Sequence, residues 1–167
     1  VNNVGFWEMD LPNGQFGERE NTFEVSNELK RLLGYNESQL NGGIKDLEAL
    51  VHPDCGERVV KQIIDHLNDK SGRTPFDMEH LMLFKDGQYR WVHTFGPAKR
   101  HANGVPYRMI ATITNIHDHK MNEEQLQSVV TRYDLINQAL VEAPWDMTVE
   151  QGDPVNPKNE FWWSPQF

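Results

Sequence analysis

The stretch FDMEHLMLFKDGQYRWVHTF, residues 76–95, predicts two antiparallel strands joined by a short turn. Before this stretch the apolar residues repeat about every 3.6 positions, as in a helix, and within it they repeat about every two, as in a strand. Lys85-Asp86-Gly87-Gln88 supplies the turn, so we expect a hairpin of residues 76–84 and 89–95. Antiparallel hairpins with helices grouped elsewhere in the chain are typical of an α+β fold, which we therefore predict.

The sequence on either side of this hairpin supplies further strands and helices. Further strands are expected at residues 5–11, 22–25 and 107–116. Helices are expected at residues 26–34, 37–40 and 44–51, and from His52-Pro53-Asp54 onward. Ser26 is suited to cap the first of these helices and Gly34 to end it. The predicted order is two strands, several short helices and three strands.

A helix with a coiled-coil repeat is predicted at about residues 120–142. Its apolar residues are spaced alternately three and four apart, which is the seam of a two-stranded coiled coil: Leu126, Val129, Tyr133, Ile136 and Leu140. Two interpretations stay open. The seam joins two copies in a parallel dimer, or the helix is a single amphipathic helix that lies on its own domain.

Charge and composition exclude several classes of protein. The net charge of −9 disfavours a nucleic-acid or membrane-surface partner, because such binders usually carry a basic face. Residues 1–120 hold 17 acidic and 14 basic residues, whereas residues 121–167 hold 8 and 2, so we place a domain boundary near Lys120. The single cysteine, Cys55, excludes an internal disulfide, and no apolar run approaches the ~18 residues of a membrane span. We expect a cytoplasmic location without direct membrane contact, in a piece of a longer protein.

Part of the N-terminal sequence recurs near the C-terminus without a gap. The recurring residues are Trp7, Met9, Gly14, Asn21, Phe23 and Ser26, which match Trp145, Met147, Gly152, Asn159, Phe161 and Ser164. We therefore predict three segments: a domain at 1–120, a connecting helix at 121–142, and the truncated start of a second copy of the domain at 143–167.

Five motifs in this order resemble the PAS family of sensory modules, in the variety with a trailing C-terminal motif. They are Gly5-Phe6-Trp7-Glu8-Met9-Asp10, Ser26-Asn27-Glu28-Leu29-Lys30-Arg31-Leu32-Leu33-Gly34-Tyr35, His52-Pro53-Asp54, Phe84-Lys85-Asp86-Gly87-Gln88-Tyr89-Arg90-Trp91-Val92 and Ala111-Thr112-Ile113-Thr114-Asn115-Ile116-His117. The resemblance covers about residues 4–120. It implies a five-stranded antiparallel sheet with short helices on one face, followed by an amphipathic signalling helix.

Two details refine the resemblance. The family ends its last strand with an Asp-Ile-Thr signature, and the corresponding residues here are Asn115-Ile116-His117. Asn115 can therefore accept or donate a hydrogen bond but cannot form the salt bridge of the acidic residue. The recurring segment at 143–167 resembles the tandem PAS modules of bacterial methyl-accepting chemotaxis receptors.

Strand alternation sorts the sheet residues into two faces. The resemblance implies that the face toward the helices lines a ligand cavity. We place there, together with Ile63 of the long helix, the residues Met78, His80, Met82, Val92, Thr94, Met109, Ala111 and Ile113. Methionine packs well into irregular gaps, so a filled or very small cavity and a pocket for a small organic ligand both stay open.

The opposite face and the helix seam are expected to relay the signal. The relay residues are Leu81, Leu83, Trp91, Phe95 and Asn115, followed by the seam Leu126, Val129, Tyr133, Ile136 and Leu140. A change at the inner face is expected to alter the packing around Trp91 and Phe95 and so to shift the helix at 120–142. Such coupling is a population shift between two packings.

Catalysis and bound cofactors are not predicted. The sequence holds neither a phosphate-binding loop nor a nucleophile elbow, so we assign no catalytic residue and predict that the chain is not an enzyme. His117-Asp118-His119 lacks further ligands for a metal ion. Haem on His66 or His80 is disfavoured. Flavin is disfavoured too, because Ile113 stands where flavin-binding relatives place a glutamine, and the setting of Cys55 does not resemble their adduct cysteine.

We therefore predict a sensory or signal-relay PAS module of a bacterial signal-transduction protein similar to chemotaxis receptors. It is expected to form a homodimer and to act on a downstream PAS domain and an output domain in the same chain. One alternative is a ligand-free dimerisation module of a histidine kinase or a cyclic-di-nucleotide enzyme. The other is a haem or flavin sensor of redox state or gas.

Overall fold

The computed structural model describes residues 3–40, 43–139 and 145–163. Contacts divide the chain into two units, Val1–Lys120 and Met121–Phe167. Among the described residues, none of the helices combines the length and the hydropathy needed to cross a membrane.

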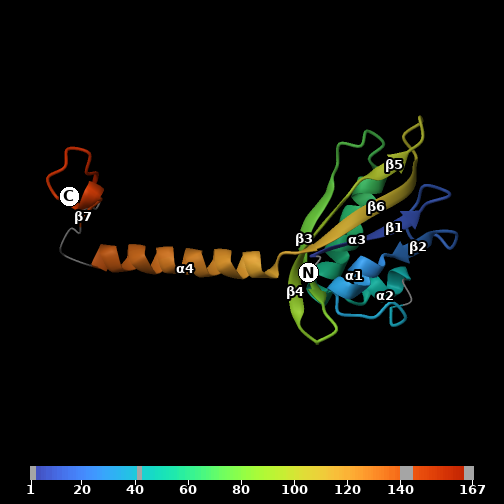
Figure 1. Cartoon of the computed structure of the whole chain (residues 1–167). Coiled ribbons are helices and arrows are strands. Elements are labelled where there is room, and N and C mark those ends of the chain that lie inside the picture. Colours follow the sequence, from blue (N-terminus) through green and yellow to red (C-terminus); the bar gives the residue numbers. More distant parts are fainter. Residues whose placement is uncertain (1–2, 41–42, 140–144, 164–167) are drawn as a thin grey trace. The chain divides into compact units, whose positions relative to one another are not determined.

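The first unit is built on one antiparallel sheet with the strand order β2-β1-β6-β4-β3 (Figure 1). The strands are β1 (Val4–Asp10), β2 (Thr22–Val25), β3 (Phe76–Leu83), β4 (Tyr89–Gly96) and β6 (Pro106–Asn115). Strand β6 lies in the middle, where Ala111 pairs with Trp7 of β1 and Ile113 pairs with Thr94 of β4. The predicted α+β class and the five-stranded antiparallel path are confirmed.

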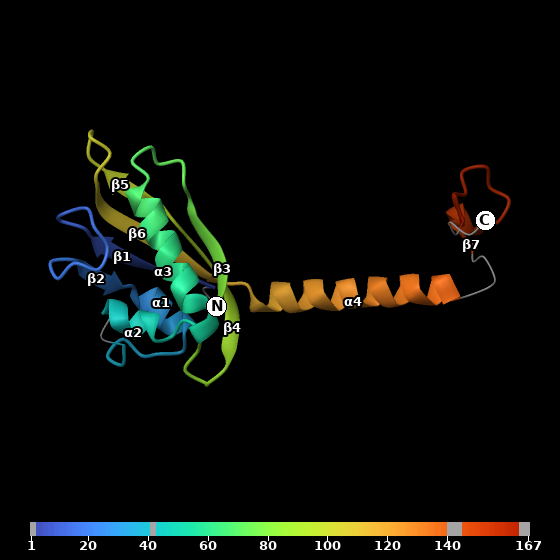
Figure 2. The same cartoon turned by 180° about the vertical axis from the view of Figure 1, so that it is seen from behind.

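Three helices cover one face of this sheet (Figure 2). They are α1 (Asn27–Leu32), α2 (Ile44–Glu48) and α3 (Pro53–Asn68). The Ser26 hydroxyl accepts a hydrogen bond from the Leu29 N–H at 3.1 Å, so Ser26 caps α1 as expected. His52 caps α3 in a similar way, because its Nδ1 accepts from the Asp54 N–H at 3.2 Å.

A short strand that the sequence did not predict, β5 (Ala98–Arg100), also pairs with β6. Its three residues are too few to show an alternating pattern. Its position depends on a contact distant in sequence. The Arg100 guanidinium donates hydrogen bonds to the backbone carbonyls of His66, at 2.7 Å, and Leu67, at 3.0 Å, near the end of α3.

The predicted helix at 37–40 is wrong. These residues form a turn, in which Gln39 accepts a side-chain hydrogen bond from the Asn36 N–H and its own N–H donates to the Asn36 carbonyl. The helix predicted at 44–51 is shorter, because Val51 pairs with Met82 as an isolated bridge.

The helix that follows the sheet, α4 (His117–Ala139), begins earlier than the predicted residue 120. The Asn115 side-chain oxygen accepts a hydrogen bond from the His117 N–H at 2.9 Å, and Asn115 therefore caps the helix at its first residue. The predicted end at residue 142 lies outside the described residues.

The second unit contains a small hairpin, β7 (Trp145–Met147) and β8 (Phe161–Trp163). Trp145 pairs with Trp163 and Met147 with Phe161, which is the register of the recurring positions in the first unit, where Trp7 pairs with Val25 and Met9 with Phe23. The hairpin is therefore the same in both places as far as it is described.

The loops inside the two hairpins also share their hydrogen bonds. The Asn21 side chain donates to the Gln15 carbonyl at 2.9 Å, and the Asn159 side chain donates to the Asp153 carbonyl at 3.0 Å. Gly14 and Gly152 have positive φ angles of 75° and 73°. Ser164, which recurs from Ser26, and residue 143, where the second copy is predicted to begin, lie outside the described residues.

Close packing of α1 on β1 requires a residue without a side chain at Gly5. A Cβ atom there would lie 2.3 Å from the Leu29 Cα, which is far inside van der Waals contact. Leu29 is itself fully buried. The helix can therefore approach the sheet this closely only over glycine.

We expect Gly5→Ala to lower the free energy of unfolding of the chain by about 1–3 kcal/mol, because the added methyl group must push α1 from the sheet. The matched control is Gly56→Ala in α3, where no atom lies within 4 Å of the added Cβ. This control should be neutral or stabilise by up to about 1 kcal/mol, since alanine favours helix. Urea denaturation of both variants checks the prediction, which fails if the two losses are equal.

Candidate functional site

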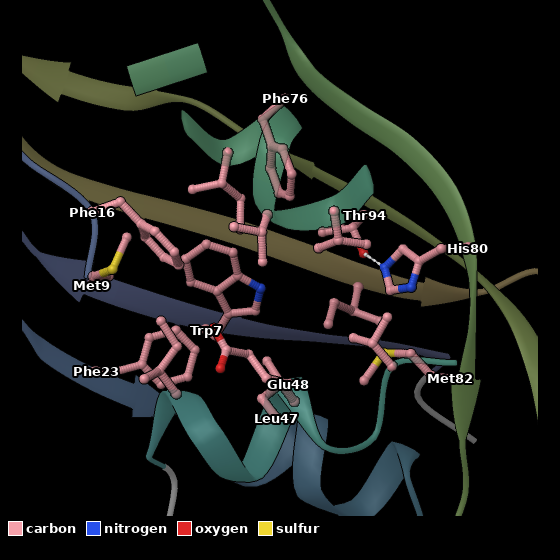
Figure 3. Close-up of a pocket in the computed structure, with 16 residues that line it drawn as sticks. Trp7, Met9, Phe16, Phe23, Leu47, Glu48, Phe76, His80, Met82 and Thr94 are labelled. Atoms are coloured by element: carbon pink, nitrogen blue, oxygen red, sulfur yellow. Dashed lines mark hydrogen bonds between the residues drawn. The ribbon is translucent and has the colours of Figure 1, made fainter. Parts of the chain in front are cut away.

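A small cavity of about 50 Å³ lies between the helices and the inner face of the sheet (Figure 3). The inner face of the sheet forms one side of the cavity, and α2 and α3 close the other side. The lining residues are Trp7, Met9, Phe16, Phe23, Ile44, Leu47, Glu48, Val51, Val59, Val60, Ile63, Phe76, His80, Met82, Thr94 and Ile113. Apolar side chains dominate this lining, so the cavity favours a mostly apolar occupant.

Every one of the five main strands supplies at least one of these side chains. Five of the predicted pocket residues line the cavity: Ile63, His80, Met82, Thr94 and Ile113. The other four, Met78, Val92, Met109 and Ala111, are buried in the core and lie outside the lining. Strand alternation identified the face on which these residues lie, but it does not say where along that face a gap is left.

Sequence reasoning missed the aromatic side of the cavity. Trp7 and Phe23 come from the β1–β2 hairpin, and their ring centroids lie 5.3 Å apart. Phe76 contacts Trp7 edge-on, with centroids 6.3 Å apart. The signal available in the sequence was the alternation of residues 5–11, which places Trp7 and Met9 on one face of β1.

The residues from α2 were missed for a different reason. Leu47 and Glu48 line the cavity, although α2 has only five residues. So short a helix shows little periodicity, and its position over the sheet depends on the tertiary fold.

The buried polar group of the cavity is the pair of His80 and Thr94. His80 Nε2 lies 2.9 Å from Thr94 Oγ1, and both residues are 2 % exposed. Nδ1 of the same ring is buried and has no hydrogen-bond partner among the described residues. Burial lowers the pKa of His80 to about 4; the charge of Arg58 acts in the same direction and the Leu81 backbone acts against it.

The residues present do not fit a haem or a flavin. Sites for ligands of that size usually enclose about 300–1,000 Å³, whereas this cavity measures about 50 Å³. His66 is buried and uses both ring nitrogens: Nδ1 lies 2.6 Å from the Thr74 carbonyl, and Nε2 accepts from the Ala98 N–H at 3.1 Å. Cys55 is buried in α3 and does not line the cavity.

The outer face of the sheet carries the predicted relay residues. Leu81 pairs with Trp91, and Leu83 lies two positions further along β3; all three are partly buried. Phe95 is 47 % exposed. Phe6 of β1, which was not predicted, lies on the same outer face and is 42 % exposed.

Several contacts hold the junction between the sheet and α4. Asn115 accepts from the His117 N–H, and the Ile116 N–H donates to the Trp91 carbonyl at 3.0 Å. Lys120 in the first turn of α4 forms an ion pair with Glu79 of β3, with 2.5 Å between Nζ and Oε2. Sequence reasoning missed this ion pair, because an i to i+41 contact leaves no local pattern.

The predicted seam of α4 is exposed in the single chain. The exposed fractions are 66 % for Leu126, 59 % for Val129, 53 % for Tyr133 and 48 % for Ile136. Leu140, the last predicted seam residue, lies outside the described residues.

A family model and a curated relative both match this chain. The family model of the PAS fold matches residues 22–113. An uncharacterised protein of Pseudomonas chlororaphis is 38 % identical over 117 residues, which cover 70 % of this chain and 46 % of that protein. The chain therefore spans about half the length of this curated relative.

Solved structures show the same fold. A sensory box histidine kinase/response regulator of Burkholderia thailandensis is 27 % identical, with a TM-score of 0.60, over 81 % of this chain and 92 % of that one. The N-terminal domain of a diguanylate cyclase with a PAS/PAC sensor, from Marinobacter aquaeolei, is 18 % identical, with a TM-score of 0.54, over 70 % of this chain and 98 % of that one.

The stability of the chain is expected to fall as the pH is lowered from 6.5 toward 4. In the unfolded chain His80 binds a proton near its ordinary pKa of 6.5, whereas in the folded chain it binds one only near pH 4. Neutral His80 therefore makes its full contribution to the free energy of unfolding above pH 6.5, and this contribution is lost as the pH falls from 6.5 to 4. The loss should amount to about 3 kcal/mol. Urea denaturation at stepped pH measures it.

His80→Gln removes this titration and keeps a side chain that can hydrogen-bond to Thr94, so the variant should lose less stability across the same window. His101→Gln, in an exposed turn, is the control and should keep the wild-type slope. An unchanged slope in His80→Gln would contradict the assignment.

Proposed function

The chain belongs to the PAS fold family, and from this premise we propose that residues 1–120 sense or relay a signal that leaves the domain through α4. The observation that carries the proposal is the position of β3. Its neighbouring residues Glu79 and His80 point to opposite faces of the sheet, because side chains alternate along a strand. His80 lines the cavity, and Glu79 pairs with Lys120 of α4.

The proposed mechanism is a shift between two packings. A change at His80 and Thr94 alters how β3 and β4 lie against each other, since the side chains of these two residues are hydrogen-bonded between the two strands. Any displacement of β3 acts on Glu79, and any displacement of β4 acts on the Trp91 carbonyl that holds Ile116. Both contacts end at the start of α4, so the helix responds to the cavity.

We propose further that the chain is part of a tandem arrangement in a bacterial signalling protein similar to chemotaxis receptors. The shared register and loop hydrogen bonds of the two hairpins support a second copy that begins near residue 143. In this arrangement α4 connects one PAS domain to the next, and an output domain elsewhere in the same chain receives the signal. The cytoplasmic location stays a prediction from the composition.

The same proposal assigns no catalysis to the chain. Among the described residues that line the cavity, the polar side chains are those of Glu48, His80 and Thr94, with the indole nitrogen of Trp7. Neither a nucleophile nor a ligand set for a metal accompanies them, so a sensory role accounts for the site better than an enzymatic one. We propose that the domain works without haem or flavin, because the cavity does not fit either group.

A second candidate function is a ligand-free dimerisation module of a histidine kinase or a cyclic-di-nucleotide enzyme. The small volume of the cavity, about 50 Å³, favours it. In that case α4 still carries the interface, and the cavity is a packing gap. Mass spectrometry of the denatured protein for a bound small molecule separates the two functions, because only the sensory function expects one.

We propose that the partner is a second copy of the chain. The seam of α4 combines the spacing of a parallel coiled coil with side chains that are about half exposed or more in the single chain. Two such seams bury each other's apolar side chains, and no other kind of partner explains the alternating three-four spacing as directly.

Glu79→Gln is expected to loosen the start of α4. Amide hydrogen exchange at residues 117–121 should become about two- to fivefold faster, since a partly exposed ion pair contributes about 0.2–1 kcal/mol. Glu28→Gln is the matched control, because it breaks another exposed ion pair, that with Arg31 of α1, far from α4. Equal exchange at residues 117–121 in wild type and Glu79→Gln would refute the role of this ion pair in the relay.

The dimer is tested by light scattering of the whole chain at high micromolar concentration. Wild type should have the mass of a dimer, and Val129→Lys with Ile136→Lys should shift it to a monomer, because two charges enter the seam. Leu135→Lys is the control, since Leu135 is 60 % exposed and lies outside the seam. A monomeric wild type at this concentration would exclude the proposed dimer.

A further inference from the structure

Two polar groups of the protein, the indole N–H of Trp7 and the imidazole of His80, border the cavity. The Trp7 side chain is 5 % exposed and lines the cavity, and the contacts found for it among the described residues are those of its ring with Phe23 and Phe76. Figure 3 shows the edge of the indole that carries this nitrogen directed toward the side of the cavity on which His80 lies. Because the other side chains that line the cavity are mostly apolar, the partner that suits this donor is an acceptor inside the cavity.

The second group is the imidazole of His80. Its Nε2 is engaged with Thr94, and its Nδ1 is buried without a partner. One ring nitrogen of a neutral imidazole donates and the other accepts, so the ring together with the Thr94 hydroxyl can adapt to either kind of hydrogen bond. A molecule that meets Trp7 through an acceptor can therefore also meet a polar group at the opposite side.

The lining excludes an ion as the occupant. Apart from the groups just named, the cavity is lined by apolar side chains, with one carboxylate, that of Glu48, on an exposed residue. A single N–H donor does not compensate a buried anion. A buried cation would need a charged partner inside the cavity, and Glu48 is exposed. The occupant is therefore neutral.

The volume limits the size of the occupant. One water molecule needs about 10–15 Å³ of cavity volume measured in this way. The 50 Å³ cavity therefore accepts a molecule of about three to five non-hydrogen atoms. This is well below the size of a nucleotide, a sugar or an aromatic cofactor.

We propose that the cavity binds a small neutral oxygen compound, a short-chain alcohol or ketone, whose oxygen accepts the hydrogen bond of the Trp7 indole. This inference rests on the proposed sensory function and names the class of molecule sensed. The short alkyl group of such a molecule lies against the apolar side chains, among them Met82 and Ile113. Its oxygen meets the indole N–H of Trp7.

The experiment titrates the whole chain with 1-propanol and follows the indole N–H signals in a proton–nitrogen correlation spectrum. The chain has five tryptophans, and the signal of Trp7 is identified as the one that Trp7→Phe lacks. We expect a saturable shift of this signal with a dissociation constant in the millimolar range, because so small a ligand has few contacts. Xenon, of similar size but without a polar atom, is the apolar probe.

Two variants test the role of the polar groups. Thr94→Val and Trp7→Phe should each weaken the binding of 1-propanol about three- to tenfold, since each removes one hydrogen-bonding group. Thr94→Val keeps the shape of the side chain and should leave the binding of xenon unchanged, whereas Trp7→Phe enlarges the cavity and should keep or strengthen the binding of xenon. Backbone amide signals of the cavity strands report binding in Trp7→Phe. The matched controls on the outer face, Thr112→Val and Trp91→Phe, should bind both probes as wild type does.

The possible outcomes are distinct. Equal binding of 1-propanol by Trp7→Phe, Thr94→Val and wild type would overturn the proposal, and so would binding of xenon without 1-propanol. Binding of neither probe would mean that water alone fills the cavity, which also overturns it. None of these results bears on the proposed relay from β3 to α4, which is tested separately by hydrogen exchange in Glu79→Gln. Conversely, 1-propanol that binds without changing exchange at residues 117–121 would support the ligand class and contradict the relay.

Discussion

The pairing of β6 with both β1 and β4 is the interaction on which the rest of the first unit depends. It joins the beginning and the end of the unit, since Trp7 pairs with Ala111 and Thr94 pairs with Ile113. This register decides which side chains face the helices, because a slip of one residue would turn every inner side chain outward. The close approach of α1 over Gly5 then depends on β1 being held in this place.

The size of the cavity follows from the side chains and not from the fold. Large residues, among them Trp7, Phe76 and Met82, fill most of the space between the helices and the sheet. Smaller residues at the same positions would enclose a larger cavity within the same architecture. The remaining space lies next to the polar groups of Trp7, His80 and Thr94, so it offers hydrogen-bonding groups as well as apolar side chains.

The recurring residues of the two hairpins show why a repeat can be found from so short a segment. Four of the six recurring pairs have a task that the local geometry of the hairpin imposes. Gly14 and Gly152 adopt a positive φ that other residues avoid, and Asn21 and Asn159 bridge their loops with the same side-chain hydrogen bond. Trp7 with Phe23 and Trp145 with Phe161 form the same aromatic contact, so most of the residues that recur are those that the backbone and the pairing need.

The sequence by itself determined the fold class, the order of the main strands, the inner and outer faces of the sheet, and the capping of α1 by Ser26, because these features follow from local periodicity and local hydrogen bonds. Only the tertiary structure decided where the inner face leaves a gap, that Trp7 and Phe23 line it, and that Lys120 pairs with Glu79. It also added β5, whose position depends on Arg100 reaching the end of α3. These contacts join residues far apart in the chain, and distance in sequence leaves no periodic pattern from which they could be inferred.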